Sequence, residues 1–413
     1  MRDPNFDRRG FLAAATTATI LASASEAGAQ RRRRGGGYDV VVVGAGVFGA
    51  WTAWQLQQKG ARVLLTDAWG PAHSRASSGG ETRLIRTEYR GDPIYTRWSK
   101  DSLVEWKLLA ERTRLPLFRE TGALYIFPEI DEKIEKSAVL HRQLGIPYEQ
   151  ISPADLARRW PQIDFTGIAI GVMQPTMGAL MAYQSVQALT ELFVARGGTY
   201  RQVEIVPPRI AGDRLGEVLT TKGERIAADK FVFACGPWLP KLFPEAVGAR
   251  IVPSRQDVFF FAPEGGDTRF MSPAMPAWVD VSSPDLHYGF PDLESRGFKI
   301  ALDKHGPAYD PDSIDRRVRD RAVADVRAYL RKRFPALANR PLAESRVCQY
   351  ENSHNGNLLL DRHPSAANVW IAGGGSGHGF KHGPAVGRYV AGLLDGSSKV
   401  EQRFLFATHR EHG

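Results

Sequence analysis

Residues 40–49 read VVVVGAGVFG, and this stretch decides the fold of the first half of the chain. Four consecutive valines indicate a buried strand of a parallel sheet, and the glycines that follow have the G-x-G-x-x-G spacing of a dinucleotide-binding turn. In such a turn Gly44 allows the tight bend, Gly46 lets the backbone approach a pyrophosphate, and Gly49 lets helix and strand pack closely. We expect the helix to span residues 50–59 and to receive the phosphates at its N-terminus.

A second short apolar strand is expected at residues 62–66, and it ends at Asp67. This acidic residue follows the turn at about the spacing (~20 residues) at which a carboxylate binds a ribose hydroxyl. The alternative is a purely structural glycine turn. Strand, turn, helix, second strand and acid together favour a dinucleotide site, without deciding between NAD and FAD.

Length and composition indicate a globular protein of two or three domains. The chain has 413 residues, 43% hydrophobic and 24% charged, and beyond the first thirty residues it has no apolar run long enough to span a bilayer. Arg31–Arg34 supply four of the nine net positive charges, so we interpret residues 30–37 as a basic, glycine-rich tether. Basic residues interleaved with aromatic residues on one face are not found, so we expect no nucleic-acid partner and no stable membrane insertion.

The first 29 residues are interpreted as an export signal. Arg8 and Arg9 precede an apolar run at 13–24, and residues 27–29 read AGA, a small-x-small cleavage site ending at Ala29. Paired arginines before such a run resemble a twin-arginine signal, which carries folded cargo. We therefore expect the twin-arginine export machinery as a partner and a periplasmic or extracytoplasmic location. An ordinary secretory leader or a disordered tail is the alternative.

The pattern of hydrophobic and polar residues changes twice after the predicted nucleotide-binding segment. Residues 252–351 contain half-buried strands, including Phe298–Asp303, and one long charged helix expected at Ser313–Phe334. Parallel-strand texture returns near Asn368. We predict a mixed α/β fold in which a nucleotide-binding Rossmann domain is interleaved with an antiparallel-sheet domain. The first domain takes residues 38–118, 178–252 and 353–413, and the second takes 119–177 and 253–352.

A second glycine-rich loop follows the last buried strand. Residues 373–381 read GGGSGHGFK, whereas an ordinary strand-to-helix turn needs one or two glycines. So many glycines indicate that the backbone passes close to a flat or anionic group, and His378 and Lys381 add polar groups there.

Several motifs in a fixed order resemble a known family. The chain carries GAGVFG at 44–49, GETRLIR at 80–86, YGFP at 288–291, VCQY at 347–350 and SGHGFK at 376–381. In these motifs and their spacing it resembles the monomeric sarcosine oxidase family, which also holds N-methyltryptophan, pipecolate and fructosyl-amine oxidases. That family lies within the D-amino-acid-oxidase-like flavoproteins. The resemblance implies a glutathione-reductase-like FAD domain and a sheet domain covering the flavin.

The resemblance also implies roles for individual residues. Cys348 matches the cysteine joined to the flavin 8α-methyl group, and Arg86 and Lys381 match the pair that binds the substrate carboxylate. Lys299 matches the lysine that promotes reaction with dioxygen. Tyr288 and Tyr350 match tyrosines that line the substrate cavity. The residues expected to contact FAD are Gly44, Gly46, Val47, Phe48, Gly49, Asp67, Arg83, Cys348, Gly375, Ser376, Gly377, His378, Gly379 and Lys381.

Physical chemistry supports these roles, although each of these residues also has a simpler interpretation. A guanidinium and a second cation hold a carboxylate well, a buried cation stabilises charge on dioxygen, and a thiolate is the nucleophile suited to the flavin methyl carbon. Alternatively, Arg86 forms a surface pair, Lys299 reaches water from a strand end, and Cys348 is a core thiol. Cys235 is interpreted as structural, although a disulfide between the two cysteines is open in an exported protein. No metal site is expected.

Three departures from the resemblance bear on the substrate. Asp303 stands where sarcosine-specific members carry a histidine, Gly375 where an aromatic side chain closes the pocket, and Glu351 where a small hydroxyl residue is usual. A missing aromatic ring enlarges the pocket and makes sarcosine itself doubtful. An extra carboxylate favours a substrate with a second positive charge.

The expected function is FAD-dependent oxidation of the amine of an amino acid, secondary, N-methyl or cyclic, to an imine by a monomer, with dioxygen as acceptor and hydrogen peroxide as product. One alternative is a periplasmic dehydrogenase that passes electrons to a quinone or cytochrome. The other is a non-catalytic exported protein that binds flavin or another ligand.

Overall fold

The computed structural model describes residues 37–282, 285–313 and 315–409. The export signal predicted at 1–29 and nearly all of the predicted tether at 30–37 lie outside these ranges. From Asp39 onward the chain forms one unit by its internal contacts.

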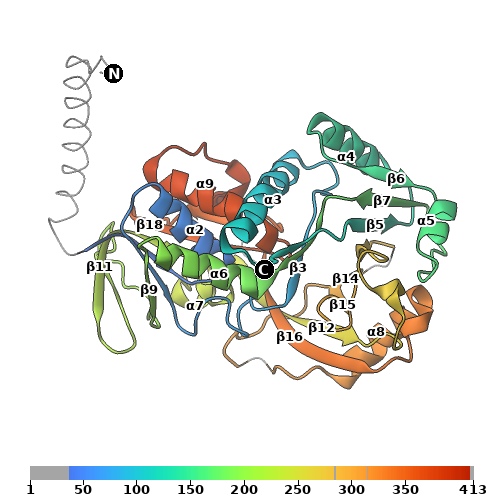
Figure 1. The fold of residues 1–413 in the computed structure, drawn as a ribbon. Helices are drawn as coiled ribbons and strands as arrows, with labels where there is room; N and C mark the ends of the chain where they lie inside the picture. The colour runs from blue at the N-terminus through green and yellow to red at the C-terminus, as the bar shows by residue number, and fades with distance from the viewer. Residues whose placement is uncertain (1–36, 283–284, 314, 410–413) are drawn as a thin grey trace, which may run out of the picture. The chain divides into compact units, whose positions relative to one another are not determined.

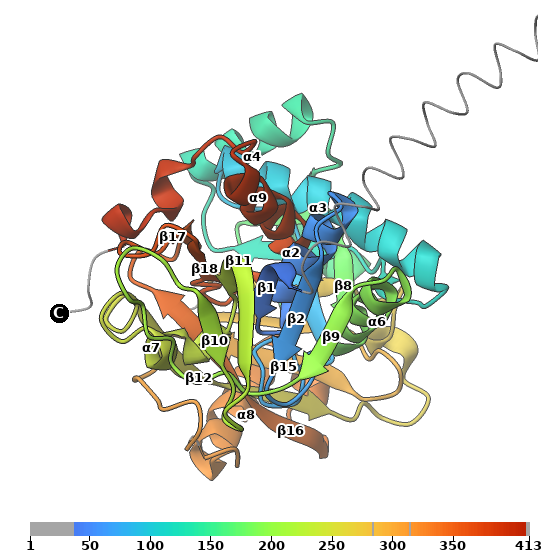
Figure 2. The same cartoon turned by 90° about the vertical axis from the view of Figure 1, so that its left-hand side faces the viewer.

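Among the described residues, seven strands form the sheet that carries the dinucleotide turn (Figures 1 and 2). The buried valines of residues 40–43 pair in parallel with residues 63–66, which confirms the two strands expected from the sequence. In sheet order the strands are β17 (Leu359–Arg362), β18 (Val369–Gly373), β11 (Arg225–Phe233), β1 (Tyr38–Val43), β2 (Val63–Asp67) and β9 (Thr199–Gln202), with β10 (Glu217–Leu219) beside β11.

Helices α2 (Val47–Gln58), α6 (Ala182–Ala195) and α9 (Gly383–Asp395) pack beside this sheet. Gly387 lets helix α9 pack closely against helix α2, because a Cβ there would lie 2.6 Å from the Trp51 backbone of α2. Strand β18 and helix α9 thus pack in the same sheet layer as β1 and α2, more than 300 residues after them in the chain, while the predicted domain bounds stay a prediction.

Eight further strands of the described chain form a second, mostly antiparallel sheet, seen with helix α8 (Asp320–Arg333) in Figure 1. Val326 and Leu330 of α8 pack with Phe259, Phe298 and Ile300 in one apolar cluster. One neighbouring pair is parallel. In sheet order the strands are β16 (Leu342–Ser353), β12 (Ile251–Phe261), β15 (Phe298–Asp303), β14 (Leu286–Phe290), β13 (Ala277–Asp280), β5 (Ala123–Phe127), β7 (Ile170–Gln174) and β6 (Glu149–Ile151).

A small third sheet contributes to the site. It consists of β3 (Thr82–Ile85), β8 (Gly178–Met181) and β4 (Phe118–Arg119). Helix α3 (Pro93–Thr113) follows β3 and is capped by the Asp92 carboxylate. Within the described residues, the other α-helices are α4 (Glu132–Gln143), α5 (Pro153–Arg159) and the short α7 (Leu239–Leu242). The serine cap expected for α5 is confirmed, since Ser152 Oγ accepts a hydrogen bond from the Asp155 N–H at 3.2 Å.

Two expected helix starts are wrong. Helix α2 begins at Val47 rather than Ala50, because the helix starts directly at the Gly46 cap. Helix α8 begins at Asp320 rather than Ser313, because Arg255 donates to the backbone oxygens of residues 315 and 317 and so holds this segment outside a helix. The open possibility of a disulfide is also excluded, since both cysteines of the chain lie in the described ranges and are free thiols.

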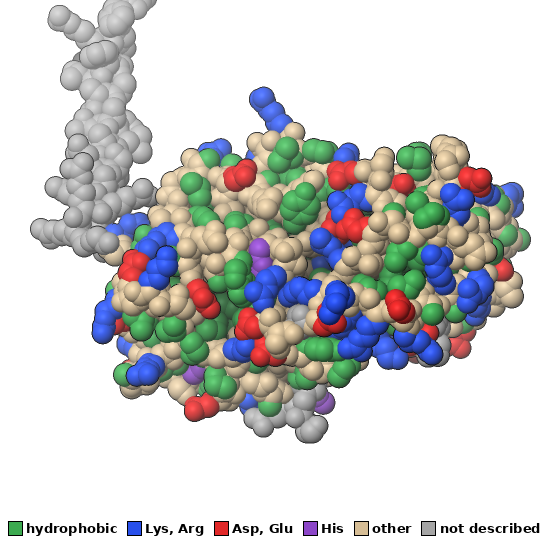
Figure 3. Space-filling view, turned by 90° about the horizontal axis from the view of Figure 1, so that it is seen from below, with side chains coloured by type: hydrophobic (Ala, Val, Ile, Leu, Met, Phe, Trp, Pro, Cys, Tyr) green, Lys and Arg blue, Asp and Glu red, His purple; other side chains and the backbone are tan. Residues whose placement is uncertain are grey.

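Many charged side chains of the described residues form ion pairs, for example Arg62 with Asp39 and Arg201 with Glu224. Figure 3 shows Asp and Glu side chains lying among the Lys and Arg side chains on one face. In the described part of the chain, no helix combines the length and the apolar character needed to cross a bilayer.

Candidate active site

The glycine turn between β1 and α2 has the geometry that its sequence predicts. Gly44 has a φ of +100°, and a Cβ there would lie 2.4 Å from the Ala234 oxygen. A Cβ on Gly49 would lie 1.8 Å from the Gly44 oxygen, so this glycine serves the packing of helix on turn. A Cβ on Gly46 would meet only Ser78 Oγ, at 3.5 Å, so the backbone at Gly46 is open to a ligand.

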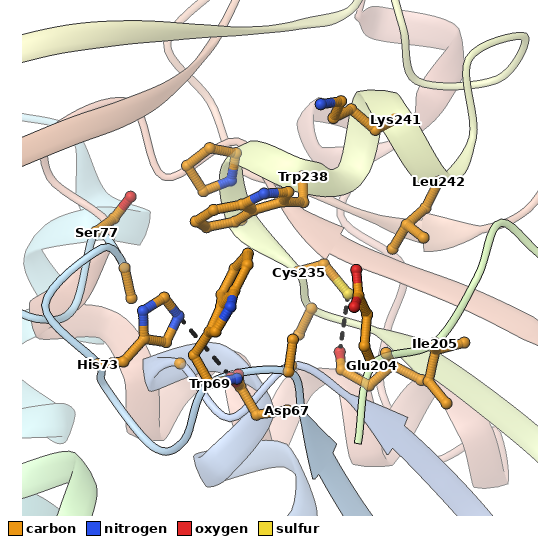
Figure 4. Close-up of a pocket in the computed structure, with 18 of the residues that line it drawn as sticks. Asp67, Trp69, His73, Ser77, Glu204, Ile205, Cys235, Trp238, Lys241 and Leu242 are labelled. Carbon is orange, nitrogen blue, oxygen red and sulfur yellow. Dashed lines mark hydrogen bonds and ion pairs between the residues drawn. The ribbon is translucent and has the colours of Figure 1, made fainter. Parts of the chain in front are cut away.

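A cleft of about 330 Å³ lies over this turn (Figure 4). Gly44, Gly46, Val47, Phe48 and Asp67 line it, as predicted for a dinucleotide. The Asp67 carboxylate accepts from the Ala45 N–H at 2.8 Å and from two N–H groups of the following turn. These bonds fix its position at the end of β2 and leave further lone pairs for a ribose hydroxyl.

The cleft also contains a group of aromatic side chains that was not predicted from the sequence. The rings of Trp69 and Trp238 lie 5.0 Å apart, and His73 lies 5.0 Å from Trp69 (Figure 4). Burial lowers the pKa of His73, while Asp67 opposes the shift. Two features of the sequence could have predicted an aromatic wall of the size of adenine. One is a tryptophan two residues after the acid at a strand end, and the other is the tryptophan of the CGPW turn at 235–238.

A smaller pocket of about 50 Å³ continues from this cleft toward the second glycine-rich loop. Both hollows are lined by Val47, Phe48, Ser77, Ser78 and Glu351, so they share one wall. Predicted site residues supply much of the remaining lining, namely Arg83, Tyr350, Gly375, Ser376, Gly377 and Gly379. The structure thus brings the two glycine-rich loops, which are more than 300 residues apart in the chain, to one elongated site.

Cys348 lies buried on β16 beside this pocket, next to a cation. Arg83 Nη2 donates to Cys348 Sγ at 3.3 Å, so the sulfur lies directly against a guanidinium. Burial acts to lower the pKa of Arg83, but Cys348 and two nearby tyrosines raise it above the ordinary value, so the guanidinium keeps its charge.

Lys299 on β15 is 2% exposed, which excludes the reading that it reaches water from a strand end. Its Nζ donates to Thr82 O at 3.0 Å and to Thr82 Oγ1 at 2.9 Å. Burial, with a smaller effect of the Arg83 charge, lowers the pKa of Lys299 to about 7. Close to neutral pH this amine therefore exchanges readily between cation and free base.

Arg86 and Lys381 meet at Tyr89, a residue the sequence analysis did not single out. The Arg86 guanidinium lies over the Tyr89 ring at 3.9 Å, and Lys381 Nζ donates to the Tyr89 hydroxyl at 3.2 Å and to His378 O at 2.8 Å. Burial and then Arg86 lower the pKa of Lys381 well below its ordinary value. A bound anion would relieve the repulsion between these two cations.

The Tyr89 hydroxyl also contacts two histidines, at 2.6 Å to His382 Nε2 and 3.2 Å to His378 Nδ1. His378 Nε2 donates to Gly356 O at 2.9 Å, so this ring faces Tyr89 and the neighbouring backbone. Burial and Lys381 lower the pKa of His378 to about 3, so the ring is neutral. Contact of the His378 side chain with the cofactor stays a prediction.

The two predicted cavity tyrosines lie together, with their hydroxyls 3.4 Å apart. Burial raises the pKa of Tyr288 to about 12 and that of Tyr350 well above its ordinary value, so both are neutral phenols. They lie beside Asp303, whose charge acts on both pKa values.

Glu351 lies where the two hollows meet. Burial raises its pKa to about 8, against the hydrogen bonds from the Gly375 and Gly374 N–H groups that lower it. Its Oε2 has no hydrogen-bond partner among the described residues. At neutral pH the group is a carboxylic acid, which is able to donate to an oxygen of a ligand in the cleft.

Fold and site define a flavoprotein, and comparison with known proteins identifies its family. The chain belongs to the family described as FAD dependent oxidoreductase, which matches residues 39–393. This match confirms the resemblance, the fold and the enzyme class that the motifs predict.

Named relatives are similar over nearly their whole length. The monomeric sarcosine oxidase of Bacillus sp. (strain NS-129) is 30% identical over 383 residues, covering 91% of this chain and 97% of the relative. The N-methyl-L-tryptophan oxidase of Salmonella arizonae is 28% identical over 86% of this chain and 94% of the relative. Among solved structures, NikD, an unusual amino acid oxidase essential for nikkomycin biosynthesis, superposes with a TM-score of 0.70 at 25% identity over 89% of this chain and 96% of that chain. L-proline dehydrogenase from P. horikoshii shares the fold with a TM-score of 0.76 at 22% identity, over 88% of this chain and 94% of that chain.

The residues present fit FAD. The open backbone at Gly46 stands at the N-terminus of α2, where backbone N–H groups and the helix dipole stabilise a pyrophosphate. The Val47 N–H of this turn donates to Ser78 Oγ at 3.1 Å. Asp67 and the Trp69–Trp238 pair stand where ribose and adenine would bind, and the continuous smaller pocket leads toward Cys348. Glu351 adds an unpaired polar atom along this path.

Proposed function

We propose that this protein oxidises the amine of an amino acid, secondary, N-methyl or cyclic, to an imine, with dioxygen as acceptor and hydrogen peroxide as product. The observation that carries the proposal is a set of three cations near the smaller pocket: the half-buried Arg86 and the buried Lys381 at Tyr89, and the buried Lys299 at Thr82. When bound, FAD accepts a hydride from the substrate and delivers electrons to the acceptor.

Arg86 and Lys381 are assigned the substrate carboxylate. A guanidinium fork binds a carboxylate through two hydrogen bonds, and the ammonium of Lys381 adds a second charge-assisted bond. Tyr89 holds both cations, which fixes the direction in which the carboxylate binds. Orientation of this kind places the carbon that bears the amine in one geometry and contributes directly to rate.

Lys299 is assigned the reaction with dioxygen. Dioxygen gains negative charge when it accepts an electron, and a cation in a buried site stabilises that charge strongly. Thr82 holds the Lys299 amine through two hydrogen bonds, so the cation needs no reorganisation during the reaction.

Cys348 is proposed to hold FAD covalently. Its sulfur lies against the Arg83 guanidinium in a buried position, and a positive neighbour of this kind is typical of reactive cysteines. The relatives named for sarcosine and N-methyl-L-tryptophan support the amine substrate, since both names are those of N-methyl amino acids.

The test is a spectroscopic screen of the purified protein against N-methyl and cyclic amino acids. We expect at least one to bleach the flavin absorbance without oxygen and to yield hydrogen peroxide when air is admitted. Bleaching that is reversed by a quinone or cytochrome but only slowly by oxygen would instead show a dehydrogenase. If none of the amino acids bleaches the flavin, amine oxidation is wrong.

We also propose export by the twin-arginine route, on the sequence of residues 1–29 alone. Replacing Arg8 and Arg9 together by lysine should leave the protein, flavin included, in the cytoplasm of the producing cell. Unchanged export of that variant would contradict the twin-arginine assignment.

A further inference from the structure

Asp303, the last residue of β15, carries a carboxylate that the described protein leaves unsatisfied. Its Oδ1 is buried and has no hydrogen-bond partner among the described residues. A Cβ on Gly377 would lie 3.1 Å from this oxygen and 2.7 Å from the Tyr350 ring, so the carboxylate lies directly behind Gly377 and Tyr350, two residues that line the smaller pocket. A buried acceptor without a donor is costly unless a ligand supplies the donor.

The charges around Asp303 are the two cations assigned to the substrate carboxylate. Burial raises the pKa of Asp303, while His305, Arg86 and Lys381 and a hydrogen bond from Tyr350 oppose the shift. With Arg86 and Lys381 protonated and Asp303 ionised, the site presents two cations and one anion. That arrangement is complementary to a zwitterion, an amino acid with a carboxylate and an ammonium group.

We propose that Asp303 binds the ammonium group of the amino-acid zwitterion while Arg86 and Lys381 hold its carboxylate, and that Asp303 accepts the ammonium proton. This inference rests on the proposed function and names the protonation state in which the substrate binds. It makes Asp303 a catalytic residue in addition to the three cations.

The proton transfer balances without an oxidant. One N–H bond of the substrate breaks and one O–H bond forms on Asp303, so an ammonium and a carboxylate become a neutral amine and a carboxylic acid. The amine lone pair that remains is what loss of a hydride from the neighbouring carbon requires. At neutral pH most amino acid in solution is zwitterion, so Asp303 gives access to the abundant form instead of the rare neutral amine.

Glu351 does not serve this role. Its carboxyl group accepts hydrogen bonds from the Gly374 and Gly375 N–H groups and faces the dinucleotide cleft. The titratable and charged groups that act on Asp303 come from several elements and must be considered in any pH profile. They are Arg86 after β3, Tyr125 on β5, Tyr288 on β14, His305 after β15, Tyr350 on β16 and Lys381 before α9.

The first test measures how the second-order rate of anaerobic flavin bleaching depends on pH in the holoenzyme. With Asp303 intact, we expect a level rate across neutral and mildly alkaline pH, because the zwitterion itself reacts. In Asp303→Asn only the neutral amine reacts, so the rate should rise about tenfold per pH unit up to the pKa of the substrate amine. Parallel pH profiles for the two proteins would overturn the proposal.

Two further variants separate a chemical role from a structural one. Asp303→Glu keeps a carboxylate and should restore the level profile, at a lower rate. Asp285→Asn makes the same chemical change at an acid that pairs with exposed Lys304, and it should leave the profile as in the wild type. An Asp303→Glu protein with the steep profile of Asp303→Asn would also overturn the proposal.

The second test needs no turnover, so it is independent of the proposed reaction. Betaine and 3,3-dimethylbutyrate have the same shape and carboxylate, but only betaine carries a positive nitrogen. Titration followed by the flavin spectrum should show that the wild type prefers betaine and that Asp303→Asn loses this preference by roughly thirtyfold. If Asp303→Asn prefers betaine as strongly as the wild type does, ammonium recognition by Asp303 is refuted. If the wild type prefers betaine, the variant does not, and the wild type oxidises no amino acid, only the proposed function is contradicted.

Discussion

Two glycines of the same turn should fail in different ways when each gains one methyl group. In Gly49→Ala the new Cβ would lie 1.8 Å from the Gly44 oxygen. An ordinary C···O contact is about 3.3 Å, so turn and helix must separate by roughly 1.5 Å. Backbone meets backbone here and no rotamer relieves the clash, so we expect a loss of at least about 3 kcal/mol of unfolding free energy, the upper end of overpacking costs.

In Gly46→Ala the fold should be preserved, because the new Cβ meets only Ser78 Oγ at 3.5 Å and the backbone at Gly46 has a φ of −74°. The methyl group instead occupies the surface that the pyrophosphate approaches. We expect an affinity for FAD that is lower by on the order of 100-fold.

The assay combines urea unfolding, followed by circular dichroism, with the flavin content of the purified protein. Gly49→Ala should lose both stability and flavin, whereas Gly46→Ala should unfold like flavin-free wild type and contain little flavin. The reasoning is refuted if Gly49→Ala is as stable as the wild type, or if Gly46→Ala retains a full complement of flavin.

Three other predictions concern single side chains of the site. Cys348→Ser should bind FAD but release its yellow colour on acid precipitation, whereas colour that stays with the denatured variant would exclude the thioether. Lys299→Met should slow reoxidation of the reduced flavin by on the order of 100-fold or more while its reduction is unchanged. Because burial lowers the pKa of Lys299 to about 7, the amine is charged below that pH, and the wild-type reoxidation rate should fall as pH rises through and above it. An equal pH dependence in Lys299→Met would contradict this assignment. Glu351 has a pKa raised from 4.5 to about 8, so unfolding releases its proton between these values, and wild-type stability should fall relative to Glu351→Gln as pH rises from 4.5 to 8. Parallel stability curves for the two proteins would show that Glu351 is ionised.

The dinucleotide turn was predictable because its requirements are local. The valine strand, the three glycines and Asp67 fix one another through backbone sterics and strand pairing, and each lies where the spacing places it. The start of helix α8 was not predictable, because the helical spacing of hydrophobic residues continues through residues 313–319. Arg255, from a strand about sixty residues earlier, binds the backbone oxygens of residues 315 and 317.

Within the site, sequence reasoning identified charged residues better than the groups that orient them. Arg86 and Lys381 stood in recognisable motifs, but Tyr89 and His382 became relevant only through contacts across nearly 300 residues of chain. Trp69 lies in the turn after β2 and Trp238 in the short 3-10 helix Gly236–Trp238, and the two rings meet only in the folded cleft. Such tertiary contacts leave no periodicity in a single sequence.

The most direct test of the account is a two-step anaerobic experiment on the purified holoenzyme. The flavin is first mixed with an excess of an N-methyl or cyclic amino acid; once the spectrum is stable, the unreacted amino acid is removed without admitting air, and the reduced enzyme is then mixed with buffer containing oxygen. We expect full bleaching in the first step, then rapid return of the oxidised spectrum with one hydrogen peroxide formed per flavin. A flavin that stays oxidised with every such amino acid, or that returns slowly in oxygen, would contradict it.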